Sequence, residues 1–287
     1  MCKKLLKYDF AYVFKIWLAL SISVVGMAIV TSLIIRSAIF INTQNGASMA
    51  STLSVLAAVF MSFGMIMIWV GILIVTPLMC YIRYYKNFFS DEGYLTFTLP
   101  VRRRDLYLAK VTNTFIFQAA NVVVSLLAVS ILMLLIPPAE EGQLINPVVF
   151  RYIGQGIRWL WSSMGGWLLM YGVLLIAFMA IRSLYNIGMI QLCITVGATV
   201  AKKHKVLAGV GIYFGSSFAM SAISQVVNIF TGGALIGFVA IVAERPDVLR
   251  HPIVVLTIFV ILLMMLTAAT VLHLITLNII ERKLNLA

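Results

Sequence analysis

Long stretches without a charged residue dominate this chain, and they predict helices that cross a membrane. Residues 16–35 carry no charge, and neither do residues 37–82, although a polar turn signal at 42–46 divides the second stretch. A crossing helix needs on the order of 20 consecutive apolar residues. We therefore predict a first span over 16–35 and a second that begins near Ala50 and ends near Tyr81.

The remaining uncharged stretches predict four further spans. The third covers 111–136 and is closed by two prolines, the fifth covers 206–230 and is ended by Thr231-Gly232-Gly233, and the last covers 254–280. The charges on either side of residues 137–202 require an odd number of crossings between them. We place one long fourth span there, at about 168–199.

Three segments are predicted to lie at the membrane surface or to enter it without crossing. In the outer loop 137–166, residues 150–166 predict an amphipathic or re-entrant helix, and residues 233–242 a re-entrant or interfacial segment. At 1–15, Lys4, Lys7 and Lys15 recur at helical spacing and oppose apolar residues, which predicts an interfacial helix. An ordinary basic flank is the alternative at 1–15.

The composition agrees with this pattern. Of 287 residues, 62% are hydrophobic and 10% are charged, whereas typical soluble domains have about 25% charged residues. The predicted fold class is therefore all-α: a polytopic integral membrane protein with six transmembrane helices. All of residues 1–287 form a single predicted transmembrane domain.

The basic residues predict the orientation in the membrane, because short cytoplasmic loops retain lysine and arginine. One set of alternating loops and ends contains 15 of the 21 basic residues, at positions 3, 4, 7, 15, 83, 86, 102–104, 110, 202, 203, 205, 282 and 283. We therefore predict a multi-pass protein of the cell membrane with cytoplasmic N- and C-termini. The net charge of +12 lies at helix ends facing anionic lipid, so nucleic acid is not an expected partner.

The motifs of catalysis and metal binding are missing from the sequence. It contains no phosphate-binding loop with a Gly-Lys-Ser/Thr ending and no His-Glu-x-x-His pair. The histidines and cysteines are far apart, and His273 within the last span is best explained by hydrogen-bonded packing. We predict that the chain is not an enzyme and holds no metal or cofactor of its own.

The cytoplasmic loop 83–110 is more elaborate than a connection between two spans requires. An acidic pair and a glycine are followed by a short apolar stretch, a Leu-Pro pair and a basic helix start. Leu95 and Leu99 lie four residues apart, as on one face of a short helix. Leu95, Phe97 and Leu99 also alternate with threonines, so an extended segment remains open.

At these residues the sequence resembles the membrane subunit of type-2 ABC exporters, particularly the short permeases of Gram-positive bacteria. The resemblance implies that the loop contains a cytoplasmic coupling helix, which docks into a groove of a separate ABC ATPase. The implied coupling residues are Asp91, Glu92, Gly93, Tyr94, Leu95, Phe97, Leu99, Pro100, Arg102, Arg103, Arg104 and Lys110.

The resemblance also implies the partners and the activity. ATP and Mg²⁺ would bind to the partner ATPase, and a second permease, identical or a paralogue, would complete the pathway for exporting an amphipathic peptide, drug or lipid-like substrate. Two alternatives remain: an ATP-independent secondary transporter or channel, and a non-transporting membrane scaffold or sensor subunit.

Three polar residues of the fourth span are candidates for a translocation path, because uncompensated polarity inside a membrane is costly. They are Arg182, Asn186 and Gln191. The alternatives are hydrogen bonds between helices and snorkelling to the membrane surface.

Overall fold

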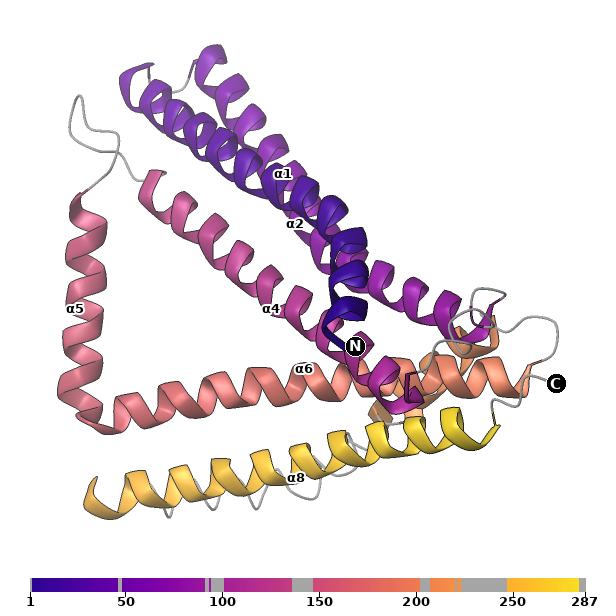
Figure 1. Cartoon of the computed structure of the whole chain (residues 1–287). Coiled ribbons are helices and arrows are strands. Elements are labelled where there is room, and N and C mark those ends of the chain that lie inside the picture. The colour runs from indigo at the N-terminus through magenta and orange to yellow at the C-terminus, as the bar shows by residue number, and fades with distance from the viewer. Residues whose placement is uncertain are drawn as a thin grey trace. The chain divides into compact units, whose positions relative to one another are not determined.

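A computed structural model describes residues 2–45, 48–90, 93, 101–135, 147–201, 207–219, 221–222 and 247–283, and these residues contain helices and no strand. The labelled helices are α1 (Cys2–Asn45), α2 (Met49–Phe89), α4 (Arg103–Leu135), α5 (Pro147–Met164), α6 (Trp167–Val200) and α8 (Asp247–Lys283) (Figure 1). A shorter apolar helix, Leu207–Ala219, follows α6.

Within the described residues, five helices are long and apolar enough to cross a membrane. The candidate spans are Lys7–Gln44, Met49–Phe89, Arg103–Leu135, Trp167–Val200 and His251–Arg282. Large apolar side chains are exposed along all five, as expected where lipid rather than water surrounds a helix. The chain is a multi-pass helical membrane protein.

The first, second, third, fourth and last predicted spans coincide with α1, α2, α4, α6 and α8 over their described residues, but most of these helices are longer than predicted. The fourth span, predicted over about 168–199, agrees closely with α6. In contrast, α2 continues to Phe89 and α4 already begins at Arg103. Charged residues mark the edge of an apolar stretch, but they do not end a helix, because lysine and arginine are themselves good helix formers.

No break in the helix separates residues 2–15 from the first span. α1 is one helix over 44 residues, and within it Phe10 stacks on Phe117 with ring centroids 5.0 Å apart. Val13 is buried in the same cluster with Cys80. Residues 10–14 thus already pack against other helices, and residues 2–15 belong to the same continuous helix as the first span; that its first turns lie in the membrane interface stays a prediction.

Of the two other segments predicted at the membrane surface, only one lies among the described residues. The helix predicted over 150–166 is present as α5, although it begins and ends slightly earlier. The re-entrant or interfacial segment at 233–242 lies outside the described residues, as does part of the fifth span beyond Ala219.

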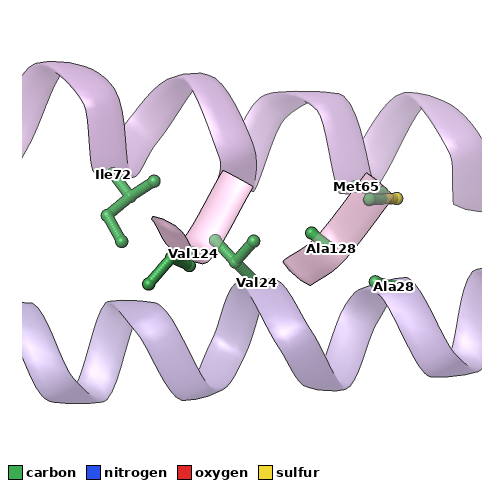
Figure 2. Close-up of a cluster of buried hydrophobic side chains, with 6 residues drawn as sticks. All are labelled: Val24, Ala28, Met65, Ile72, Val124 and Ala128. Carbon is green, nitrogen blue, oxygen red and sulfur yellow. The ribbon is translucent and has the colours of Figure 1, made fainter. Parts of the chain in front are cut away.

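The structure divides into two compact units. Unit 1 contains residues 1–80 and 112–163, and unit 2 contains residues 81–111 and 164–287. In unit 1, α1 and α2 form an antiparallel pair, and six buried side chains from α1, α2 and α4 meet between the helices (Figure 2). They are Val24, Ala28, Met65, Ile72, Val124 and Ala128.

Hydrogen bonds around Asn121 join the three helices of unit 1; we call this group the Asn121 cluster. The indole N–H of Trp17 in α1 donates to Asn121 Oδ1 at 2.9 Å, and the Asn121 amide donates to the carbonyl of Ile72 in α2 at 3.5 Å. One turn further along α4, Ser125 accepts from the indole of Trp69 at 2.8 Å. The cluster therefore fixes how the three helices are aligned.

In unit 2, α6 and α8 run side by side in the same direction (Figure 1). Near their N-terminal ends, Tyr171 and His251 are hydrogen-bonded at 3.1 Å. About four turns later along α6 and six along α8, the carbonyl of Leu184 meets His273 Nε2 at 3.2 Å. Because both pairs follow the chain in the same order, the two helices are parallel.

Glycines allow the short helix 207–219 to pack backbone against backbone on the end of α6. A Cβ placed on Gly197 would collide with the backbone of Gly209. Further along, the Cys193 thiol lies 3.7 Å from the Ser216 hydroxyl. The short helix thus runs antiparallel to α6, with small residues at the contact as is usual in membranes.

We predict that Asn121→Leu destabilises the protein, because it leaves the Trp17 indole and the Ile72 carbonyl without their partner. Hydrogen bonds between membrane helices contribute on average about 0.6 kcal/mol, with a maximum near 1.7, so a loss of about 1–2 kcal/mol is expected. Unfolding in mixed micelles measures it. Ser130→Ala is the control, because exposed Ser130 bonds only within its own helix; equal stability of both variants would contradict the role of the cluster.

Candidate functional site

The candidate site is the end of unit 2 from which the loop 90–102 leaves. The last turns of α2, the first turns of α4 and the last turns of α6 and α8 meet here. Seven of the predicted coupling residues lie outside the described residues: Asp91, Glu92, Tyr94, Leu95, Phe97, Leu99 and Pro100. The described part of the site therefore consists of the helix ends that hold the loop.

Gly93 lies close to the end of α2. Its N–H donates to the carbonyl of Ser90 at 2.8 Å, and a Cβ at this position would lie 3.1 Å from the carbonyl oxygen of Phe88. Glycine suits this position because any other residue would crowd the last turn of α2.

Tyr84 connects the end of α2 to the end of α6. Its hydroxyl lies 2.7 Å from the hydroxyl of Thr195, and both side chains are fully buried. The Thr195 hydroxyl donates its one proton to the carbonyl of Gln191. Tyr84 must therefore be the donor in the first bond, which gives it a defined direction.

Tyr107 connects the start of α4 to α8 through His273. The Tyr107 hydroxyl lies 2.6 Å from His273 Nδ1. The carbonyl of Leu184 can only accept a hydrogen bond, so His273 Nε2 carries a proton and donates to it at 3.2 Å. In the neutral ring, Nδ1 then accepts from Tyr107, so both ring nitrogens of His273 are hydrogen-bonded.

Arg103, the first residue of α4, binds the C-terminal end of α8. Its guanidinium donates to the carbonyls of Ile280 at 3.3 Å and Glu281 at 3.0 Å. The last carbonyls of a helix have no partner within it, and they carry partial negative charge, so a cation there is favourable. This contact aligns the start of α4 with the end of α8.

Lys110 is buried rather than displayed at a surface. Its ammonium donates to the Asn87 amide oxygen at 2.6 Å, while the Asn87 nitrogen donates to the carbonyl of Arg83 at 3.2 Å. Lys110 therefore joins α4 to α2. Arg102 and Arg104, by contrast, are exposed. Of the described basic coupling candidates, Arg103 and Lys110 thus hold helices together, and Arg102 and Arg104 are available for contact with a partner.

We call this set of contacts the loop-end network: Tyr84–Thr195, Tyr107–His273–Leu184, Arg103 with the end of α8, and Lys110–Asn87. The rings of Tyr84 and Tyr107 also meet edge to face, with centroids 6.3 Å apart. Through these contacts, both helices that flank the loop are fixed to α6 or α8.

The predicted translocation-path residues do not share one face of α6. Gln191 is fully buried in the bundle, and neither of its amide atoms has a hydrogen-bond partner among the described residues. Arg182 and Asn186 are exposed on the other side of the helix. The structure therefore separates Gln191 from the other two candidates.

Tyr84, Tyr107 and Thr195 were not among the site residues predicted from the sequence. A signal for Tyr84 was present, because Tyr81, Tyr84 and Phe88 recur at helical spacing across the charged boundary at Arg83. All three side chains are buried. No local pattern indicates Thr195, since its partner is distant in sequence.

The described residues contain no group of three or more histidine, cysteine or acidic residues that could hold a metal ion. Comparisons with protein-family models, with curated proteins and with solved structures find no match to this chain. Any functional assignment therefore depends on the residues and contacts of the chain itself.

We predict that Tyr84→Phe and Tyr107→Phe each loosen the helix ends beside the loop. Each substitution removes the hydroxyl that donates a hydrogen bond to Thr195 or His273. We expect the free energy of unfolding to fall by about 0.5–2 kcal/mol. Hydrogen exchange in the last turns of α2 and first turns of α4 should rise. Tyr8→Phe, at an exposed position, is the control; unchanged exchange in both network variants would mean that these bonds do not hold the helix ends.

Proposed function

We propose that this chain is the membrane-spanning permease subunit of an ATP-driven ABC exporter. The observation that carries the proposal is the loop 83–110, whose acidic-glycine, Leu-Pro and basic segments are mounted on two helix ends that the loop-end network fixes to α6 and α8. A simple connection between spans would not need this support.

The network gives the proposed coupling a physical route. An ATPase that displaces the loop would displace the ends of α2 and α4. Tyr84, Tyr107 and Arg103 would transmit this movement to α6 and α8, because buried hydrogen bonds resist separation of the helices. Both α2 and α4 also continue from unit 2 into unit 1. A movement of one short loop could thus reach all five candidate spans.

ATP binding and hydrolysis would take place on the partner subunit, with Mg²⁺ bound there. Closure of two ATPase subunits would push the coupling helices of two permeases and change the side to which the pathway opens. The second permease would be a copy of this chain or a paralogue, because one set of six helices supplies half of the pathway.

Six spans are favoured over five by the parallel course of α6 and α8. Two helices that cross the membrane in the same direction must have an odd number of crossings between them in the chain. The helix 207–219 begins such a return, because it runs antiparallel to α6 from the Gly197–Gly209 contact. We infer that the chain between α6 and α8 completes the predicted fifth span.

The contacts in unit 2 also support the proposed orientation. The basic segments that flank the loop and the basic C-terminal end of α8 meet at the same end of unit 2, and α6 ends there too, next to Lys202, Lys203 and Lys205 in the sequence. By the preference of lysine and arginine for the cytoplasm, this end is cytoplasmic, and so is the loop.

An amphipathic cargo suits the exposed polar positions in α6. Arg182 lies near the middle of α6, inside the predicted fourth span. An exposed arginine at that depth needs water or protein around it. We propose that the face of Arg182 and Asn186 lines the pathway; buried Gln191 lies on the other side of α6.

Cysteine labelling in a variant without Cys2, Cys80 and Cys193 tests the predicted orientation. Cysteines at Asn45 and Gly142 should react with an impermeant thiol reagent in intact cells. Cysteines at Ser90 and Lys203 should react only after permeabilisation. External labelling at Ser90 would refute both the orientation and the coupling role of the loop.

We predict that charged substitutions in the loop weaken ATPase docking without affecting insertion. Asp91→Lys with Glu92→Lys replaces any favourable pairs with like-charge contacts, which cost several kcal/mol at an interface. Leu95→Asp would place a charge in an apolar groove. Copurification with the ATPase subunit should weaken at least about tenfold, and transport should be lost, at normal membrane abundance.

Glu140→Lys with Glu141→Lys, in the predicted outer loop, is the matched charge-reversal control and should retain both properties. The parent chain purified alone should neither bind nor hydrolyse ATP, and the complex should contain two permease and two ATPase subunits. If the loop variants keep full association and transport, the proposed coupling helix is wrong. Robust ATP hydrolysis by the isolated chain would refute the division of roles.

A further inference from the structure

A repeated pattern in α5 distinguishes this helix from the spans. Phe150-Arg151-Tyr152-Ile153 is followed seven residues later by Ile157-Arg158-Trp159-Leu160, so that each unit reads apolar, arginine, aromatic, aliphatic. Seven residues are nearly two helical turns. The two arginines therefore lie on one side of α5, about 10 Å apart along its axis.

The helical period divides α5 into two faces along its whole length. At 100° per residue, Arg151, Gln155, Arg158 and Ser162 fall within a narrow polar stripe. Ile153 and Ile157 fall on the opposite arc, and Phe150 and Trp161 lie between this arc and the stripe; each of the four is about half exposed or more. Tyr152 and Trp159 lie beside the polar stripe. An apolar arc, a cationic stripe and aromatic rings at the border are the features of helices that lie in a membrane interface.

The continuity of the polar stripe argues against other placements. If α5 crossed the bilayer or entered it deeply, at least one arginine would lie in hydrocarbon, where an arginine at the centre costs about 2.5–3.5 kcal/mol even on the lowest scales. A re-entrant segment that turns back within α5 is excluded as well. The 18 residues of α5 are helical without interruption.

The end of α5 is an independent indication of its depth. Gly165 has a φ of +56°, a conformation that favours glycine, and it ends α5 just before α6 begins at Trp167. Three of the five tryptophans of the chain, at 159, 161 and 167, surround this turn. Tryptophan is enriched at the level of the lipid headgroups, so the turn belongs at that level, where a span starts.

We propose that α5 lies flat in the headgroup region of the outer leaflet and that Arg151 and Arg158 bind phospholipid phosphates. Among the described residues neither arginine has an ion-pair partner. A guanidinium binds phosphate through paired hydrogen bonds, and the apolar arc below would place both at headgroup depth. The arginine pair then favours anionic phospholipids over zwitterionic ones.

The first test measures depth along α5 in the full-length chain, reconstituted in vesicles of phosphatidylcholine and phosphatidylglycerol. Single spin-labelled cysteines at 149–163, in the background without native cysteines, report exposure to oxygen and to a water-soluble relaxation agent. We expect a 3.6-residue oscillation about a constant mean depth, with Ile153 and Ile157 deepest and Gln155 and Ser162 shallowest. A mean depth that changes steadily, or that peaks once in the middle, would overturn the proposal.

The second test measures the preference of the chain for spin-labelled phosphatidylglycerol over phosphatidylcholine. Arg151→Gln with Arg158→Gln should lower this preference by roughly fivefold for each arginine. Lysine at both positions should retain most of the preference, and Gln155→Ala with Ser162→Ala on the same stripe is the matched control. An unchanged preference in the double glutamine variant would overturn the phosphate contacts.

The two tests are separable from the proposed exporter function, because neither requires an ATPase. Only the assignment to the outer leaflet rests on the proposed orientation. Labelling of the same cysteines in oriented vesicles decides it, and reaction from the cytoplasmic side would overturn that assignment without changing the depth profile.

Discussion

The packing of this protein depends on one constraint: a polar group in hydrocarbon has no water to bind, so its partner must come from the protein. Apolar packing alone specifies helix alignment weakly in a membrane, because lipid chains are as apolar as leucine. Asn121 shows how the constraint is met in unit 1, where one amide binds both an indole of α1 and a carbonyl of α2. Sliding either helix by one residue would break these bonds, so a single asparagine determines the register of three helices.

The same constraint has a different consequence in unit 2, where the polar contacts gather at the end that carries the loop. Tyr84 and Tyr107 lie on the two helices that flank the loop, and their partners Thr195 and His273 lie on α6 and α8. Because each bond is buried, moving one helix end without the other would leave a polar group unpaired. The four helix ends are therefore tied to one another, which is the property that the proposed coupling role requires.

Hydropathy predicted the helical membrane class and the position of α6 closely, because these depend on local composition. It failed at the helix ends, where Arg83 and Lys110 interrupt apolar stretches although the helix continues through both. It also separated 1–15 from the first span, since the lysines there hide the packing of Phe10 and Val13. The candidate site was located by the loop motif, but its support was not, because the pairs Tyr84–Thr195 and Tyr107–His273 join residues more than a hundred positions apart. Such pairs leave no local signal in one sequence.

The lengths of the spans explain why function should be sought at their ends. α2 has 41 residues, or about 61 Å, whereas the hydrocarbon core is about 30 Å thick. Tilts of membrane helices reach about 40°, and even then α2 would cover about 47 Å along the membrane normal. It must therefore extend beyond the hydrocarbon, and Arg83 and Lys86 favour the end at Phe89 as the one that does so. The loop is thus carried on helical turns that stand clear of the lipid chains, where a soluble partner can reach it, while the buried tyrosines hold those turns to the rest of unit 2.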